Sequence, residues 1–109
     1  MAYDHALADE IRAALPPDVP IAEKAMFGGL AFLVDGNMAV AANGRGGLLV
    51  RTDPVGVDAL LAPGVEPMVM RGRPMPGWLF VEGPAIEGQD AVTAWVRRGV
   101  AFARTLPAK

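Results

Sequence analysis

Apolar positions near both ends of the chain recur at the spacing of an α-helix. The first set is Tyr3, Leu7, Ile11 and Leu15. It predicts an amphipathic helix over residues 3–15. Pro16 and Pro17 stop this helix, because proline cannot continue helical hydrogen bonding. A longer stripe predicts the last helix, which follows Gly88-Gln89-Asp90: Val92, Trp95, Val96, Gly99, Phe102, Ala103 and Leu106.

The middle of the chain consists of short apolar runs separated by glycine, proline, aspartate and asparagine. Such runs predict β-strands over residues 22–27, 29–34, 37–42, 48–52, 67–70 and 78–81. Asp35-Gly36-Asn37 predicts a hairpin turn, because these residue types reach positive φ at little cost. Gly28-Gly29 admits a hairpin turn or a bulge in one long strand, and we favour the hairpin.

Two connecting segments complete the order of elements. Asp53 as N-cap and Pro54 at the first helical position predict a short helix that ends at Pro63-Gly64. Residues 71–77 are rich in glycine and proline and predict a loop. Consecutive strands form a β-meander, so we expect an α+β two-layer sandwich. Its sheet is mostly antiparallel, and the N- and C-terminal helices pack on one face.

Size and composition restrict the class of protein. The 109 residues suit a single domain over residues 1–109, and 52% hydrophobic residues support one core. The chain has no cysteine and a net charge of −2. The absence of cysteine fits a reducing compartment. We find no apolar run long enough to span a membrane and no secretion signal. We therefore expect a cytoplasmic protein that does not contact the membrane.

The residues needed for catalysis or metal binding are sparse. The chain has no serine, and its hydroxyl groups are Tyr3, Thr52, Thr93 and Thr105, for which no base is evident. His5 is the single histidine, and we expect it to be solvated rather than a metal ligand. The sequence therefore predicts no enzyme, no metal and no cofactor.

One stretch resembles a known family. Met26-Phe27-Gly28-Gly29-Leu30-Ala31-Phe32, followed by Val34-Asp35-Gly36-Asn37-Met38, resembles the signature of the N-terminal domain of the bacterial TfoX (Sxy) competence regulators. Similar blocks extend the resemblance from about Tyr3 to Leu106: Leu49-Val50-Arg51, Gly72-Arg73-Pro74-Met75 and Ala94-Trp95-Val96.

The resemblance implies both a fold and a function. The fold is a sandwich similar to secretion chaperones, and the function is a non-enzymatic regulatory or protein-interaction module. Full-length relatives control transcription of competence genes and carry a further C-terminal domain, which these 109 residues do not include. We therefore carry the competence role over only as background.

A basic set supplies the candidate partner-binding residues: Lys24, Arg51, Arg71, Arg73 and the neighbouring Trp78. If the segment is extended, Arg71 and Arg73 share one face, and Met68, Met70 and Met75 flank them. Arginine beside adaptable methionine suits an acidic or phosphorylated partner. Alternatively, the arginines pair with Glu66, Glu82 or Asp53 and the methionines fill the core.

The motif residues Met26, Phe27, Gly28, Gly29, Asp35 and Gly36 are expected to be structural. The leading interpretation is a module that binds a protein, with exposed Met, Trp and Phe as anchors for a homodimer. The alternative is nucleic-acid binding through Arg45, Arg51, Arg71, Arg73 and the arginines of the last helix, Arg97, Arg98 and Arg104. A third interpretation is a small-molecule site at the Gly28-Gly29 bend.

Overall fold

The computed structural model describes residues 4–26, 28–44 and 46–109. The helices are α1 (His5–Ala14) and α2 (Gln89–Ala103), with short 3-10 turns η1 (Val57–Leu60) and η2 (Gly83–Ile86). The strands are β1 (Ala22–Met26), β2 (Gly29–Val34), β3 (Asn37–Ala42), β4 (Leu48–Arg51), β5 (Val65–Met70) and β6 (Arg73–Val81).

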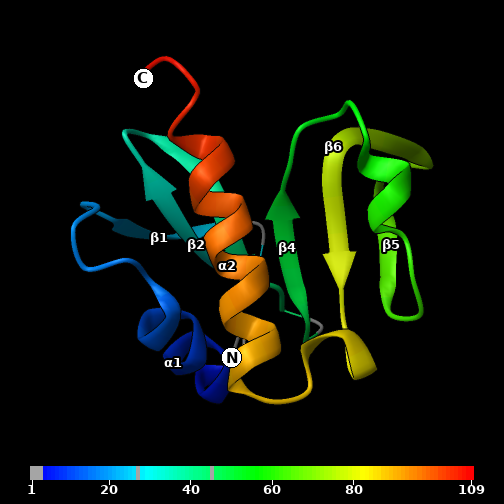
Figure 1. Cartoon of the computed structure of the whole chain (residues 1–109), viewed down its shortest axis with the longest axis horizontal. Coiled ribbons are helices and arrows are strands. Elements are labelled where there is room, and N and C mark those ends of the chain that lie inside the picture. Colours follow the sequence, from blue (N-terminus) through cyan, green and yellow to red (C-terminus); the bar gives the residue numbers. More distant parts are fainter. Residues whose placement is uncertain (1–3, 27, 45) are drawn as a thin grey trace.

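The strands form one antiparallel sheet in the order β1-β2-β3-β4-β6-β5. Both helices contact each other and pack on one face of this sheet (Figure 1). The predicted α+β arrangement of an antiparallel meander with two terminal helices is therefore confirmed.

Helix α1 is capped at its start by Asp4 and is held against α2 by hydrogen bonds. The Asp4 carboxylate accepts hydrogen bonds from the backbone N–H groups of Ala6 and Leu7, at 2.9 and 3.2 Å, and so caps the helix. Two side chains of α2 hold α1 in place. Arg97 Nε donates to the carbonyl of Ala14 at 3.1 Å, and Gln89 Nε2 donates to the carbonyl of Glu10 at 2.9 Å.

The main core lies between the helices and the sheet. Its largest fully buried side chains include Phe32 of β2, Ile11 of α1 and Leu79 of β6. Strand β3 carries a bulge, because Phe32 pairs with Val40 while Leu33 pairs with Met38. Helix α2 approaches this bulge closely at Gly99, where an added Cβ would lie 2.5 Å from the carbonyl oxygen of Ala39. The contact requires glycine.

Two sequence-based expectations about connecting segments are wrong. Strand β6 begins at Arg73, within the segment predicted as a loop. Pro74 and Pro76 are tolerated there because β4 pairs only with residues 78–81, so this part of β6 has no β4 neighbour that needs its N–H groups. Asp53 does not cap a helix. Its carboxylate accepts from the N–H of Val55, and left-handed Gly56 precedes the short 3-10 turn η1.

Candidate functional site

The sheet face opposite the helices carries a second, smaller apolar cluster. Ala31, Ala41 and Leu49 are buried there, although no helix covers this face. Partly buried hydrophobic side chains cover them instead: Met26, Met38, Met68 and Trp78. Met68 belongs to β5, the last strand in the sheet order, so this end of the sheet bends toward the open face.

This bend is produced by the hairpin of β5 and β6. Pairing between these strands is regular at Val65–Val81 and Pro67–Leu79, is interrupted, and resumes at Val69–Pro74. At the interruption, left-handed Gly77 holds β6 against Thr52, whose N–H donates to the Gly77 carbonyl at 2.6 Å. The tip of the hairpin therefore leaves the plane of the sheet and lies over its open face.

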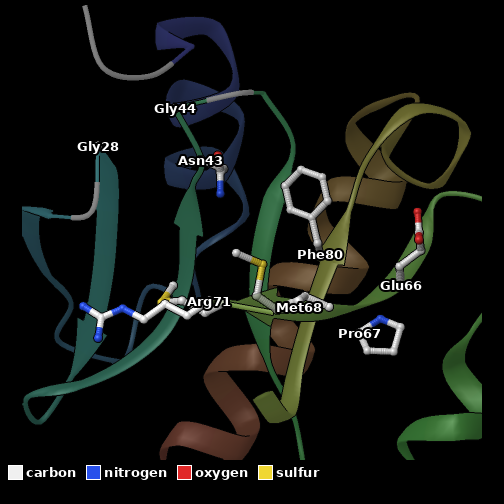
Figure 2. A pocket seen from close by; sticks show the side chains of 10 residues that line it. Gly28, Asn43, Gly44, Glu66, Pro67, Met68, Arg71 and Phe80 are labelled. Carbon is white, nitrogen blue, oxygen red and sulfur yellow. The ribbon is translucent and has the colours of Figure 1, made fainter. Parts of the chain in front are cut away.

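A groove of about 630 Å³ lies between this hairpin and the opposite turns. One wall is six consecutive residues, from Glu66 to Arg71, and the other wall includes Gly28, Asn43 and Gly44. Figure 2 shows Met68 and Phe80 projecting into the middle of the space, with the Arg71 guanidinium and Glu66 toward opposite ends. The groove is thus apolar in its middle, with one charge of each sign at its ends.

Arg71 occupies an unusual backbone conformation. It is the first residue of the two-residue turn between Met70 and Arg73, and both turn residues have positive φ, 54° at Arg71 and 77° at Gly72. The β2–β3 hairpin uses the same turn type, with φ of 51° at Asp35 and 83° at Gly36. Aspartate tolerates this conformation, whereas arginine is strained by it.

The structure separates most of the predicted partner-binding residues. Arg71 lies in a turn rather than an extended segment, so the alternation that would place it on one face with Arg73 does not apply. Lys24 is exposed on the edge strand β1, opposite Ala31. Of the predicted partner-binding set, the groove contains Arg71 and not Lys24, Arg51, Arg73 or Trp78.

Arg51 has a structural position between two aromatic rings. Its guanidinium carbon lies 5.1 Å from the centroid of the Trp78 ring and 5.9 Å from that of Phe102 in α2. Both distances are within the range of cation–π attraction. The contact joins the end of β4 to the second apolar cluster and to α2, so Arg51 and Trp78 contribute to the packing around the sheet.

Ion pairing among the described residues is concentrated at Arg12. Its guanidinium donates to both carboxylate oxygens of Glu23, each at 2.8 Å, and to Asp9, also at 2.8 Å. These bonds lower the pKa of Glu23 and raise the pKa of Arg12. Within the part of the chain that the structure describes, Lys24, Arg71 and Arg73 form no salt bridge. The alternative of pairing with Glu66, Glu82 or Asp53 is therefore not found.

The motif residues form turns and close contacts. Gly28, with φ of 72°, lies in the turn between β1 and β2, and a Cβ at Gly29 would collide with the carbonyl oxygen of Ala42. The Asp35 carbonyl accepts from the N–H of Lys109 at 2.8 Å. The buried Asn37 amide donates to the carbonyl of Pro107 at 2.9 Å, so this hairpin holds the segment after α2. Phe27 and Arg45 lie outside the described residues.

Sequence reasoning missed part of the groove. Phe80 could have been found, because it stands two residues after Trp78 in a strand and therefore on the same face. Asn43 and Gly44 had no such signal, because the curl of the β5–β6 hairpin alone brings them opposite β5. Met68 and Met70, flagged beside the arginines, do line the groove, and Met70 is 37% exposed.

Within residues 4–26, 28–44 and 46–109, no group of three or more His, Cys, Asp or Glu side chains is placed to hold a metal ion. In the same ranges, neither helix is long and apolar enough to cross a membrane.

The fold and the groove together define a small α+β domain with a concave, partly covered sheet face. The family model for the TfoX N-terminal domain matches residues 13–103, and the chain belongs to that family. No curated protein and no solved structure matches the chain, so the likeness to secretion chaperones stays a prediction.

Proposed function

We propose that this protein is a non-enzymatic regulatory module that binds a partner protein through the groove beside β5. The observation that carries the proposal is the groove itself. Large apolar side chains are exposed along one of its walls, with Val69 55% and Met70 37% exposed. Exposed apolar residues gathered at one concave site mark binding surfaces rather than ordinary protein surface.

The chemistry of the groove supports binding rather than catalysis. Among the described residues that line it, the charged side chains are Glu66 and Arg71, which lie toward opposite ends (Figure 2). General acid–base work needs a proton donor or acceptor within hydrogen-bond reach of the reacting atoms. Two groups at opposite ends of an apolar floor instead suit recognition of a partner that carries complementary charge.

The distribution of the other arginines favours a protein partner over nucleic acid. Arg97 donates to the backbone of α1, Arg98 lies 5.8 Å from the centroid of the Trp95 ring, and Arg51 lies between aromatic rings. Each of these side chains has its own contact within the fold, Arg97 and Arg98 on α2 and Arg51 on β4, and the net charge is −2. Binding to phosphates requires basic groups gathered on one surface.

Family membership supports a regulatory role, and the absence of cysteine supports a cytoplasmic location. A homodimer through exposed apolar side chains outside the groove remains part of the proposal. Light scattering measures the mass in solution directly, against 11.4 kDa for one chain.

The test compares two substitutions of the same kind. Val69→Glu places a carboxylate in the groove, at a position that is 55% exposed. Val55→Glu introduces the same carboxylate outside the groove, at a more exposed position, since Val55 is 84% exposed. Wild-type and variant proteins are used for affinity capture from nuclease-treated native lysate, and each partner is then purified and titrated. We expect Val55→Glu to retain the partner and Val69→Glu to lose it, because a buried unpaired carboxylate is strongly unfavourable.

Urea unfolding of both variants provides the control that the fold is intact. Equal capture by Val69→Glu and the wild type would show that the groove is not the binding surface. If the partner is captured only from lysate that was not treated with nuclease, nucleic acid mediates the interaction.

A further inference from the structure

We infer that the groove receives one extended segment of the partner protein, which adds to the sheet beside β5 and places a carboxylate against Arg71. This inference rests on the proposed function and specifies the occupant of the same groove. It follows from the free edge of β5, from the apolar middle of the groove, and from the charge at the turn.

Strand β5 is the last strand in the sheet order, so one of its edges has no strand beside it among the described residues. The N–H and the carbonyl of Val65 both bond to Ala62, at 2.8 and 3.5 Å, on the side away from β6. Further along, Met70 and Arg73 flank a two-residue turn, so the backbone groups of Met70 point toward β6 and bond to Arg73. Successive residues of a strand point their backbone groups to opposite edges. The backbone groups of Val69, one residue before, consequently point to the free edge.

Proline at position 67 fits this free edge, because proline has no N–H group to leave unpaired there. Val69 therefore offers a backbone donor and acceptor, and Pro67 offers an acceptor. Strand addition uses such groups for affinity, and side-chain pockets along the strand for specificity. Met68 and Phe80 supply that pocket (Figure 2), and methionine adapts to apolar side chains of different shape.

The charges at the two ends of the groove determine which end of the segment lies beside Arg71. Arg71 forms no salt bridge among the described residues, while Glu66 lies toward the other end of the groove. Arg71 is strained at its φ of 54°. The same sheet forms this turn with an Asp-Gly pair at residues 35–36, and aspartate tolerates the conformation better. The positive φ at Arg71 therefore carries a conformational cost that a favourable contact of its side chain would offset. A carboxylate on the partner complements Arg71, and an uncharged or basic residue complements Glu66.

The shape of the groove favours a single segment over a second copy of the chain. Its volume of about 630 Å³ is bounded on one side by β5 and on the other by the turns at Gly28 and Gly44. Clefts of this size hold small ligands and short segments.

The experiment selects the occupant from a display library of random octapeptides, using the immobilised full chain. We expect the enriched peptides to alternate apolar and polar residues and to carry an acidic residue toward one end. The best peptide is then synthesised with a fluorophore, and its affinity is measured by anisotropy. Arg71→Asn should weaken binding about 10- to 100-fold, the usual range for losing one charged hydrogen bond. Arg104→Asn, on an exposed arginine after α2, should not weaken it.

Backbone methylation of the peptide tests strand addition without altering the protein. N-methyl groups at alternate residues should abolish binding, and those at the intervening residues should leave it unchanged, because only one edge of an added strand meets β5. Enrichment of apolar residues at helical spacing, a methylation pattern without period two, or no enrichment would overturn the inference. If Val69→Glu still loses the native partner in any of those cases, the proposed function stands and only the extended occupant is wrong.

Discussion

At the scale of single residues, two X-Gly turns whose residues are both described offer a matched comparison. Asp35 and Arg71 hold the same turn position with φ of 51° and 54°. Arg71→Asn should raise the free energy of unfolding by about 1 kcal/mol, because asparagine adopts the left-handed conformation readily. Asp35→Arg should lower it by a similar amount, and urea unfolding measures both. An unchanged free energy of unfolding in Arg71→Asn would mean that the turn is not strained at Arg71.

The pair of Arg12 and Glu23 predicts a pH dependence. Both Arg12–Glu23 hydrogen bonds favour the charged carboxylate, so the folded-state pKa of Glu23 lies below its unfolded value. The pair therefore stabilises the fold above the unfolded pKa of about 4.3, and this contribution is lost as the pH falls through the folded pKa.

Glu23→Gln should consequently be less stable than the wild type at pH 7 and approach it near pH 2. Urea unfolding across this range measures the difference. Because both side chains are more than a third exposed, the effect should be small and should shrink with added salt. A difference that is the same at both pH values would contradict the assignment.

At the scale of elements, the close packing of α2 against β3 depends on Gly99. Glycine to alanine normally stabilises a helix by about 1 kcal/mol. Here the added Cβ would lie 2.5 Å from the Ala39 oxygen and 2.8 Å from Val40 Cγ1. We therefore expect Gly99→Ala to destabilise the fold by about 1–3 kcal/mol, the usual range for overpacking.

Ala101→Gly is the control for this prediction, because residue 101 is exposed on the same helix. Ala101→Gly should lower the free energy of unfolding by about 1 kcal/mol, because glycine has a lower helix propensity than alanine. Thermal or urea unfolding of both variants would decide the matter. A gain of stability in Gly99→Ala would mean that α2 sits farther from the β3 bulge than described.

The elements that could be predicted from the sequence are those with a clear period. Helix α2 was expected from its apolar stripe, although the fully packed Val100 was not part of that stripe. Strand β6 could not be predicted in full, because prolines at 74 and 76 normally exclude a strand. They are accommodated only because β4 is too short to pair with that part of β6. This length is a property of the neighbouring strand and not of the local residues.

At the scale of the whole molecule, the candidate site results from the bend of the β5–β6 hairpin over the sheet. Residues 66–71 and the turns at Gly28 and Gly44 are distant in sequence and belong to different parts of the sheet. The interrupted pairing near Gly77 brings them to opposite walls of one groove. The basic set expected at one surface is instead divided between a packing contact at Arg51, an edge strand at Lys24 and the groove at Arg71.

The sequence by itself determined the local structure, because periodicity, caps and turn residues act over a few positions. Leu7 and Ile11 place α1, Asp35-Gly36 makes its hairpin, and the ordered motifs place the chain in its family. Only the tertiary structure decided which side chains meet. Neither the 2.5 Å approach at Gly99 nor the meeting of Arg71 with the face that holds Gly28 follows from spacing along the chain. Both depend on how far the sheet bends, and that bend results from packing between segments that are far apart in sequence.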